Sequence, residues 1–92
     1  MIYRIIVSDD AREDIAALKK SEHIAYNKVQ ELFNELKENP RTGIGKPELM
    51  KYGKLAGLWS RRVSSKHRLV YSINDNEVLV LVLSAKGHYG DK

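Results

Sequence analysis

Apolar residues recur at helical spacing in one stretch of this chain. Between residues 21 and 38 they fall at positions i, i+4, i+7, i+8 and i+11: Ala25, Val29, Leu32, Phe33 and Leu36. This spacing places them on one side of a helix, so an amphipathic helix is predicted that must bury that side. Asn39-Pro40 is expected to end it, because proline disfavours helical geometry in the residue before it.

A strand and a shorter helix are predicted before this segment. Residues Ile2–Val7 form a short β-type run. Ser8 then offers an N-cap oxygen to a first helix, predicted from about Asp9 to Lys20. Ser21 is expected to cap the second helix in the same way. Two antiparallel helices joined by so short a turn form a helical hairpin.

The second half of the chain changes character. Glycines and prolines interrupt residues 40–57, which are predicted to form a long basic loop. Three strand-like runs follow at short spacing, Leu58–Val63, Arg68–Ile73 and Val78–Leu83, and predict an antiparallel meander. The third run is apolar on both faces, as in a strand inside a sheet. The expected fold is α+β in the order β-α-α-β-β-β, with the hairpin on one face of a mainly antiparallel sheet.

Length and composition limit the class of protein. The chain has 92 residues, of which 42% are apolar and 30% charged, which predicts a single globular domain over residues 1–92. It has no cysteine, so disulfides, thiol catalysis and thiolate metal sites are excluded. No apolar run approaches the 20 or so residues of a membrane helix, and the N-terminus has no signal-peptide pattern, so a cytoplasmic location without membrane contact is expected.

Charge is distributed unevenly along the chain. Residues 1–40 carry six basic and eight acidic side chains, whereas residues 41–92 carry ten basic and four acidic ones, within a total of +4. A polyanion is therefore expected to bind the second half, because phosphate contacts dominate nucleic-acid affinity. Small basic proteins are common, however, and the same charge could serve solubility alone.

The remaining polar residues suit one reaction. RNA cleavage by the ribose 2′-hydroxyl needs a base, an acid and cations that stabilise charge on the phosphoryl oxygens. Glu48 is the candidate base, because it is the only acid between residues 38 and 75, and His88 is the candidate acid. Arg61, Arg62 and Arg68 are the candidate cations. On composition alone, a surface salt bridge of Glu48 with Lys46 or Lys51 and solvated arginines on an edge strand explain the same residues better than a catalytic site does.

The other histidines carry weaker signals. His23, near the start of the second helix, is expected at the surface, and His67, at a turn, is expected to be structural or auxiliary. The histidines and carboxylates do not have the spacing of metal ligands, so no cofactor is expected.

Four motifs in this order resemble the YoeB/Txe branch of the RelE toxin superfamily. They are Gly45-Lys46-Pro47-Glu48-Leu49, Leu55-Ala56-Gly57-Leu58-Trp59-Ser60-Arg61-Arg62, His67-Arg68-Leu69-Val70-Tyr71 and Gly87-His88-Tyr89. The resemblance implies the toxin of a toxin–antitoxin pair, a ribosome-dependent endonuclease that cuts mRNA in the A site without a metal. It implies that Glu48 is the general base, that Arg68 stabilises the phosphate, that His88 is the general acid and that Tyr89 orients the substrate.

The resemblance also implies partners. The expected RNA-contacting side chains belong to the loop and to the strand after it: Lys46, Lys51, Lys54, Arg61 and Arg62. The ribosome and its mRNA would be partners, with the mRNA as substrate; a YefM-like antitoxin would be the protein partner, and a homodimer is allowed. Two alternatives stay open: a ParE-like toxin that binds a DNA topoisomerase, and a non-catalytic module that binds RNA or the ribosome.

Overall fold

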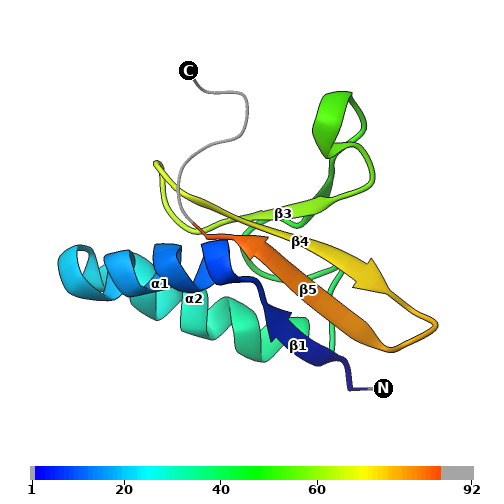
Figure 1. The fold of residues 1–92 in the computed structure, drawn as a ribbon, viewed down its shortest axis with the longest axis horizontal. Helices are drawn as coiled ribbons and strands as arrows, with labels where there is room; N and C mark the ends of the chain where they lie inside the picture. The colour runs from blue at the N-terminus through cyan, green and yellow to red at the C-terminus, as the bar shows by residue number, and fades with distance from the viewer. Residues whose placement is uncertain (1, 86–92) are drawn as a thin grey trace.

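The computed structural model of the protein describes residues 2–85. The predicted order of elements is confirmed, with one further strand: β1 (Arg4–Val7), α1 (Asp9–Ser21), α2 (His23–Leu36), β2 (Glu48–Leu49), the 3₁₀ helix η1 (Gly53–Leu55), β3 (Trp59–Arg62), β4 (Arg68–Asn74) and β5 (Leu79–Ser84). Figure 1 shows the two helices side by side on one face of the sheet.

The sheet has five strands in the order β1-β5-β4-β3-β2. The three C-terminal strands form the predicted antiparallel meander, and β1 pairs in parallel with β5. β5 lies between β1 and β4, inside the sheet as the sequence predicted, and its residues alternate between buried and partly buried up to Leu83. The prediction of an unpatterned loop over residues 40–57 was wrong in part, since β2 pairs with β3 and η1 follows it.

The predicted capping residue is correct for the first helix and wrong for the second. The Ser8 hydroxyl accepts a hydrogen bond from the backbone N–H of Ala11 at 3.1 Å, which confirms the predicted N-cap. The prediction that Ser21 caps α2 was wrong: Ser21 is the last residue of α1, and its hydroxyl bonds to the Ala17 carbonyl. Glu22 occupies the cap position of α2 and forms no side-chain cap bond there.

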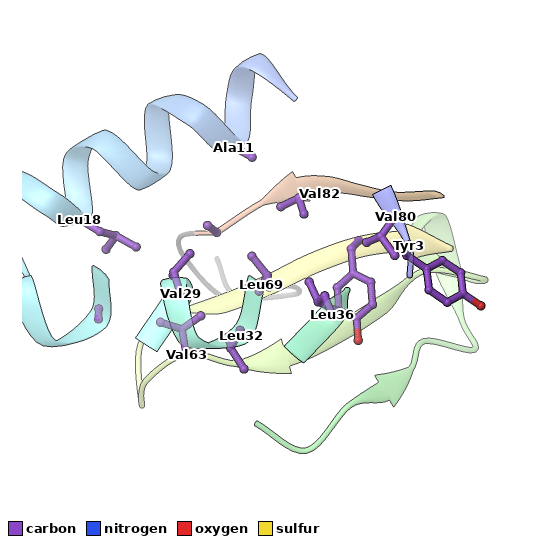
Figure 2. Packing of buried hydrophobic residues seen from close by; sticks show 13 residues of the cluster. Tyr3, Ala11, Leu18, Val29, Leu32, Leu36, Val63, Leu69, Val80 and Val82 are labelled. Atoms are coloured by element: carbon purple, nitrogen blue, oxygen red, sulfur yellow. The ribbon is translucent and has the colours of Figure 1, made fainter. Parts of the chain in front are cut away.

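The core lies between the helical hairpin and the sheet (Figure 2). The stripe predicted on the second helix supplies Ala25, Val29, Leu32 and Leu36, all buried, with Phe33 partly buried beside them. They pack with residues of α1 and of the helix-facing side of the sheet: Ala11, Leu18, Leu69, Tyr71, Val80 and Val82. Helix α2 ends at Leu36, three residues before Asn39. Among residues 2–85, no helix is long and apolar enough to span a membrane.

Candidate functional site

The candidate site lies at the edge of the sheet, on the face away from the helices. Glu48 of β2 pairs with Ser60 of β3, and Arg62 of β3 pairs with Arg68 of β4. Since side chains alternate along a strand, Ser60 and Arg62 share a face, and the pairing puts Glu48 and Arg68 on it as well. Neighbouring strands thus assemble residues that are up to 20 positions apart.

Glu48 and Arg68 form the centre of this group. The Glu48 carboxylate lies 3.9 Å from Nη1 of Arg68, and its side chain is 70% exposed. Arg68 is less exposed, at 24%, and its Nη1 also donates to the Ser60 hydroxyl at 3.4 Å. The Glu48 carboxylate is therefore accessible to a ligand, whereas the Arg68 guanidinium is held by a hydrogen bond to the buried Ser60 hydroxyl.

A cleft of about 310 Å³ opens between these residues. It is lined by Lys46, Pro47, Glu48, Arg62 and Arg68. Three cations and one carboxylate give this cleft an excess of positive charge, which suits a phosphate group. The chain turns sharply into it, because Lys46 has a φ of +51° and precedes a proline. Such positive φ values are uncommon for residues with a side chain, and they cluster at functional sites.

Two further hollows adjoin this cleft. One, of about 250 Å³, shares Lys46 and Arg62 with it and is lined as well by Lys28 of α2. The other, of about 810 Å³, shares Pro47 and Glu48 with the cleft. The rest of its lining combines apolar and aromatic residues with two cations: Leu49, Met50, Tyr52, Trp59, Arg41 and Lys51. Lys28 was missed by the sequence analysis, because nothing in the local sequence distinguishes it from any other helical lysine.

The structure brings together only some of the predicted RNA-contacting residues. Lys46 and Arg62 line the cleft, and Lys51 lines the large adjoining hollow. Lys54 lies in η1, is exposed, and lines none of these three hollows. Figure 1 shows the segment with η1 standing apart from the two helices.

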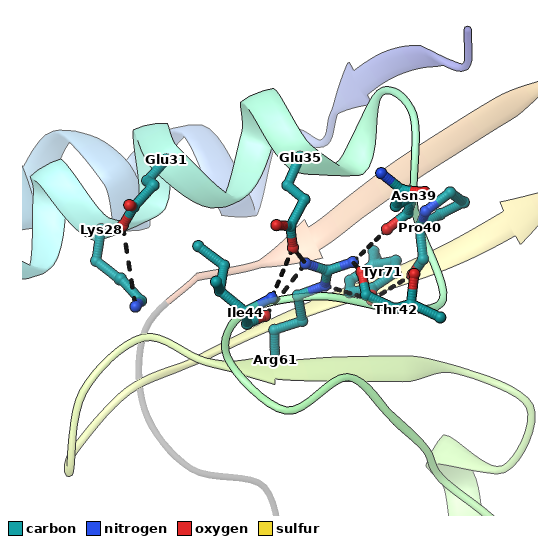
Figure 3. Close-up of polar contacts among 9 residues, drawn as sticks. All are labelled: Lys28, Glu31, Glu35, Asn39, Pro40, Thr42, Ile44, Arg61 and Tyr71. Atoms are coloured by element: carbon teal, nitrogen blue, oxygen red, sulfur yellow. Dashed lines mark hydrogen bonds and ion pairs between the residues drawn. The ribbon is translucent and has the colours of Figure 1, made fainter. Parts of the chain in front are cut away.

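Arg61 does not belong to the cleft, and its prediction as an RNA-contacting residue was wrong. Its side chain is fully buried on the helix-facing side of β3, because it alternates with Ser60 and Arg62. There it forms an ion pair with Glu35 of α2 (Figure 3). The alternative that it is merely solvated was also wrong, because its side chain is fully buried.

The remaining predicted residues fall into two groups. His67 is buried, and its Nε2 lies 3.0 Å from a Glu22 carboxylate oxygen, so it ties the turn before β4 to the helix junction; this is the structural role that the sequence allowed. His23 is exposed, as predicted. His88 and Tyr89 lie outside the described residues. Within residues 2–85, no three histidine or carboxylate side chains are grouped so that they could hold a metal ion.

A second charged group lies at the other end of the loop. Arg41 donates to both carboxylate oxygens of Asp75, at 3.3 and 2.8 Å, and the Tyr3 hydroxyl donates to the same carboxylate at 2.7 Å. The Arg41 hydrogen bonds, together with that from Tyr3, hold the pKa of Asp75 below its usual range. This group attaches the start of the loop to the turn between β4 and β5.

Comparison with known proteins gives a consistent result. Residues 7–89 match the family described as the YoeB-like toxin of bacterial type II toxin–antitoxin systems. The chain is 40% identical to the toxin YoeB of Mycobacterium bovis over 80 residues, which cover 87% of this chain and 91% of that one. It is 33% identical to the toxin YoeB of Escherichia coli K12 over 86 residues, 94% of this chain and 99% of that one.

Solved structures agree with the sequence matches. A YoeB/ParE toxin from Agrobacterium tumefaciens superposes with a TM-score of 0.85 at 28% identity, over 94% of this chain and 99% of that one. The YoeB dimer of Staphylococcus aureus gives 0.81 at 36% identity, over 97% and 100%. The toxin in a heterotetrameric YoeB–YefM complex from the same organism gives 0.79 at 33%, again over 97% and 100%.

Proposed function

Because the chain belongs to the family of YoeB-like toxins of bacterial type II toxin–antitoxin systems, we propose that it is an endoribonuclease that cuts mRNA in the ribosomal A site and so inhibits translation. The observation that carries this proposal is the cleft in which the exposed Glu48 carboxylate stands 3.9 Å from the Arg68 guanidinium. A base beside a phosphate-binding cation is the pairing that attack by a 2′-hydroxyl requires.

The proposed reaction is a transesterification. Glu48 removes the proton from the ribose 2′-hydroxyl, and that oxygen attacks the adjacent phosphorus. Arg68 and Arg62 stabilise the charge that develops on the phosphoryl oxygens, since both line the cleft. The bond to the 5′-oxygen breaks, which leaves a 2′,3′-cyclic phosphate. Side chains supply the base, the acid and the positive charge, so the proposed mechanism uses no metal.

We assign the general acid to His88 and substrate orientation to Tyr89, on the resemblance. The described end of the chain is compatible with this assignment. Ser84 pairs with Val70, which lies two residues along β4 from Arg68.

The flanking basic residues extend the proposed RNA path in two directions. Lys46 and Lys28 line the small hollow on one side of the cleft, and Lys51 lines the large hollow on the other. Lys54 is proposed as a contact at greater distance from the cleft. Because the RNA backbone carries a phosphate at every nucleotide, cations on both sides of the scissile bond would hold the strand across Glu48.

The proposed partners follow from the same surface. An acidic antitoxin segment of the YefM type would neutralise the toxin by covering the positively charged cleft. The Staphylococcus aureus relative has been solved both in complex with YefM and as a dimer, which supports an antitoxin partner and a homodimer here. Action on translating ribosomes would place the protein in the cytoplasm.

Cleavage of an mRNA on programmed ribosomes tests this function. Wild type should cut only when the ribosome is present and should leave a 2′,3′-cyclic phosphate end. Glu48→Gln and His88→Ala should each lose about 10²- to 10⁴-fold in rate, the usual contribution of a general base or acid. Glu77→Gln is the matched control, since it makes the same change at an exposed acid in the turn before β5.

Other outcomes would contradict the proposal in distinct ways. Ribosome binding without cleavage would indicate a binding module, and loss of both would favour a topoisomerase-binding toxin.

A further inference from the structure

We propose that Arg61 is a positioning residue for the reaction: it holds residues 39–44 in the conformation that delivers Lys46 and Glu48 to the cleft. This inference rests on the proposed function. Arg61 and Arg62 are neighbours on β3 with opposite orientations, so that one lines the cleft and the other organises the chain leading into it.

The Arg61 guanidinium donates hydrogen bonds to three backbone carbonyl groups of this segment. Figure 3 shows it between α2 and the loop that follows α2. Arg61 donates to three carbonyl oxygens of the loop, those of Asn39, Thr42 and Ile44, with distances of 2.8 Å for Thr42 and 3.2 Å for Ile44. The remaining contacts are its ion pair with Glu35 and a hydrogen bond from Nε to the Tyr71 hydroxyl at 3.1 Å. Since the guanidinium is planar and rigid, these acceptors can converge on it in only one arrangement.

Its two side-chain partners contact the same loop. The Tyr71 hydroxyl donates to the Pro40 carbonyl at 2.7 Å, and the Glu35 carboxylate accepts from the Ile44 N–H at 2.7 Å. Burial raises the pKa of the Tyr71 phenol above its usual range, so Tyr71 stays a neutral donor at physiological pH. Residues 39–44, which contain no helix or strand, are thus held at five backbone groups by Arg61, Tyr71 and Glu35.

The held segment continues directly into the cleft. The backbone N–H of Arg62 donates to the Gly45 carbonyl at 2.6 Å, Lys46 has its positive φ, and Glu48 then pairs with Ser60. Only three residues separate Ile44 from Glu48. A shift of the held loop would therefore move Glu48 relative to Arg68, which is anchored separately on β4.

This arrangement explains why a charged residue is kept inside the protein. An apolar side chain could fill the same volume, and replacing a buried ion pair with apolar residues often costs no stability. It could not, however, orient carbonyl groups from three positions of a loop. Displacement of a catalytic group by about 1 Å can lower a rate about 100-fold, so such orientation matters for catalysis.

The test separates positioning from stability. Arg61→Lys keeps the charge but loses the planar fork, and Tyr71→Phe removes one hydroxyl at almost constant volume. We expect the single-turnover cleavage rate on saturating ribosomes to fall at least tenfold in Arg61→Lys and about threefold in Tyr71→Phe, with ribosome affinity changed less than twofold. Hydrogen exchange of the Ile44 amide should be faster in both variants.

Val29→Ala is the control for general destabilisation, since it removes buried methyl groups of α2 that take no part in these hydrogen bonds. It should lower Tm while leaving the cleavage rate within twofold of wild type. An equal rate loss in Val29→Ala, or an unchanged rate in Tyr71→Phe despite faster exchange at Ile44, would overturn the inference. If Arg61→Lys does not fold, Tyr71→Phe alone decides. A wild-type protein that cuts no RNA would overturn the proposed function itself, before any variant is compared.

Discussion

Gly43 offers a sharp test of the buried charged group, because an alanine there would meet a carboxylate. Gly43 has a φ of +119°, and a Cβ added to it would overlap the Glu35 side chain that pairs with Arg61. Gly53, in η1, also has a positive φ, of +72°, but a Cβ there would meet no atom within 4 Å. Both substitutions put an alanine at a positive φ, but only the one at position 43 also contacts Glu35.

Two contributions lower the free energy of unfolding of Gly43→Ala. A residue with a side chain at a positive φ costs about 1–3 kcal/mol, with the larger cost at Gly43, whose φ lies farther from the left-handed helical region. Displacing Glu35 weakens its bonds to Arg61 and to the Ile44 amide, and hydrogen bonds to charged groups contribute about 1.5–3 kcal/mol each. Because Glu35 is partly exposed and can move outward, we expect about 2–3 kcal/mol more for Gly43→Ala than for Gly53→Ala.

Urea unfolding followed by far-UV circular dichroism measures this difference. At about 4–8 °C per kcal/mol for a domain of this size, Gly43→Ala should also melt roughly 10–20 °C below Gly53→Ala. Equal free energies of unfolding for the two variants would refute the reasoning, because they would mean that the Glu35 carboxylate moves away from Arg61 without cost.

Two further predictions concern charge. Asp75→Asn should lower the free energy of unfolding at neutral pH. The difference from wild type should shrink as the pH falls below about 4 and through the depressed pKa of Asp75, because the fold stabilises only the ionised carboxylate. A difference that does not change with pH in urea unfolding would contradict this. Lys28→Gln should weaken RNA binding about equally for all sequences and lower the salt dependence of the binding constant, the slope of log K against log salt concentration, by about 1. Lys37→Gln, at an exposed lysine just beyond the C-terminal end of α2, should leave both unchanged. Equal slopes in the two variants, measured by fluorescence anisotropy at several salt concentrations, would remove Lys28 from the proposed RNA path.

Much of the architecture follows from local patterns. The apolar stripe of α2 and the three C-terminal strands are read from side-chain spacing, because helices and strands each bury one periodic set of residues. The N-cap at Ser8 was equally local. The prediction for Ser21 was wrong because a serine between two helices can end the first helix as readily as cap the second. Only the packing of the hairpin decides which of the two positions it takes.

The candidate site was proposed from residue types and motif order, before the structure showed where those of its residues that it describes lie. Glu48 and Arg68 drew attention as an acid in a basic loop and an arginine in a motif. That they face each other depends on β2, a strand of two residues that no local pattern predicted, because its pairing with β3 comes from outside its own sequence.

The sequence by itself determined that Arg61 and Arg62 point to opposite sides of a strand, since side chains alternate there. Only the tertiary structure decided which of them faces the helices. The hairpin covers one side of the sheet and supplies Glu35, so that the arginine on that side becomes a buried support, while its neighbour lines the open cleft. Two identical residues acquire different roles because burial is a property of the assembled layers, which no short stretch of chain contains.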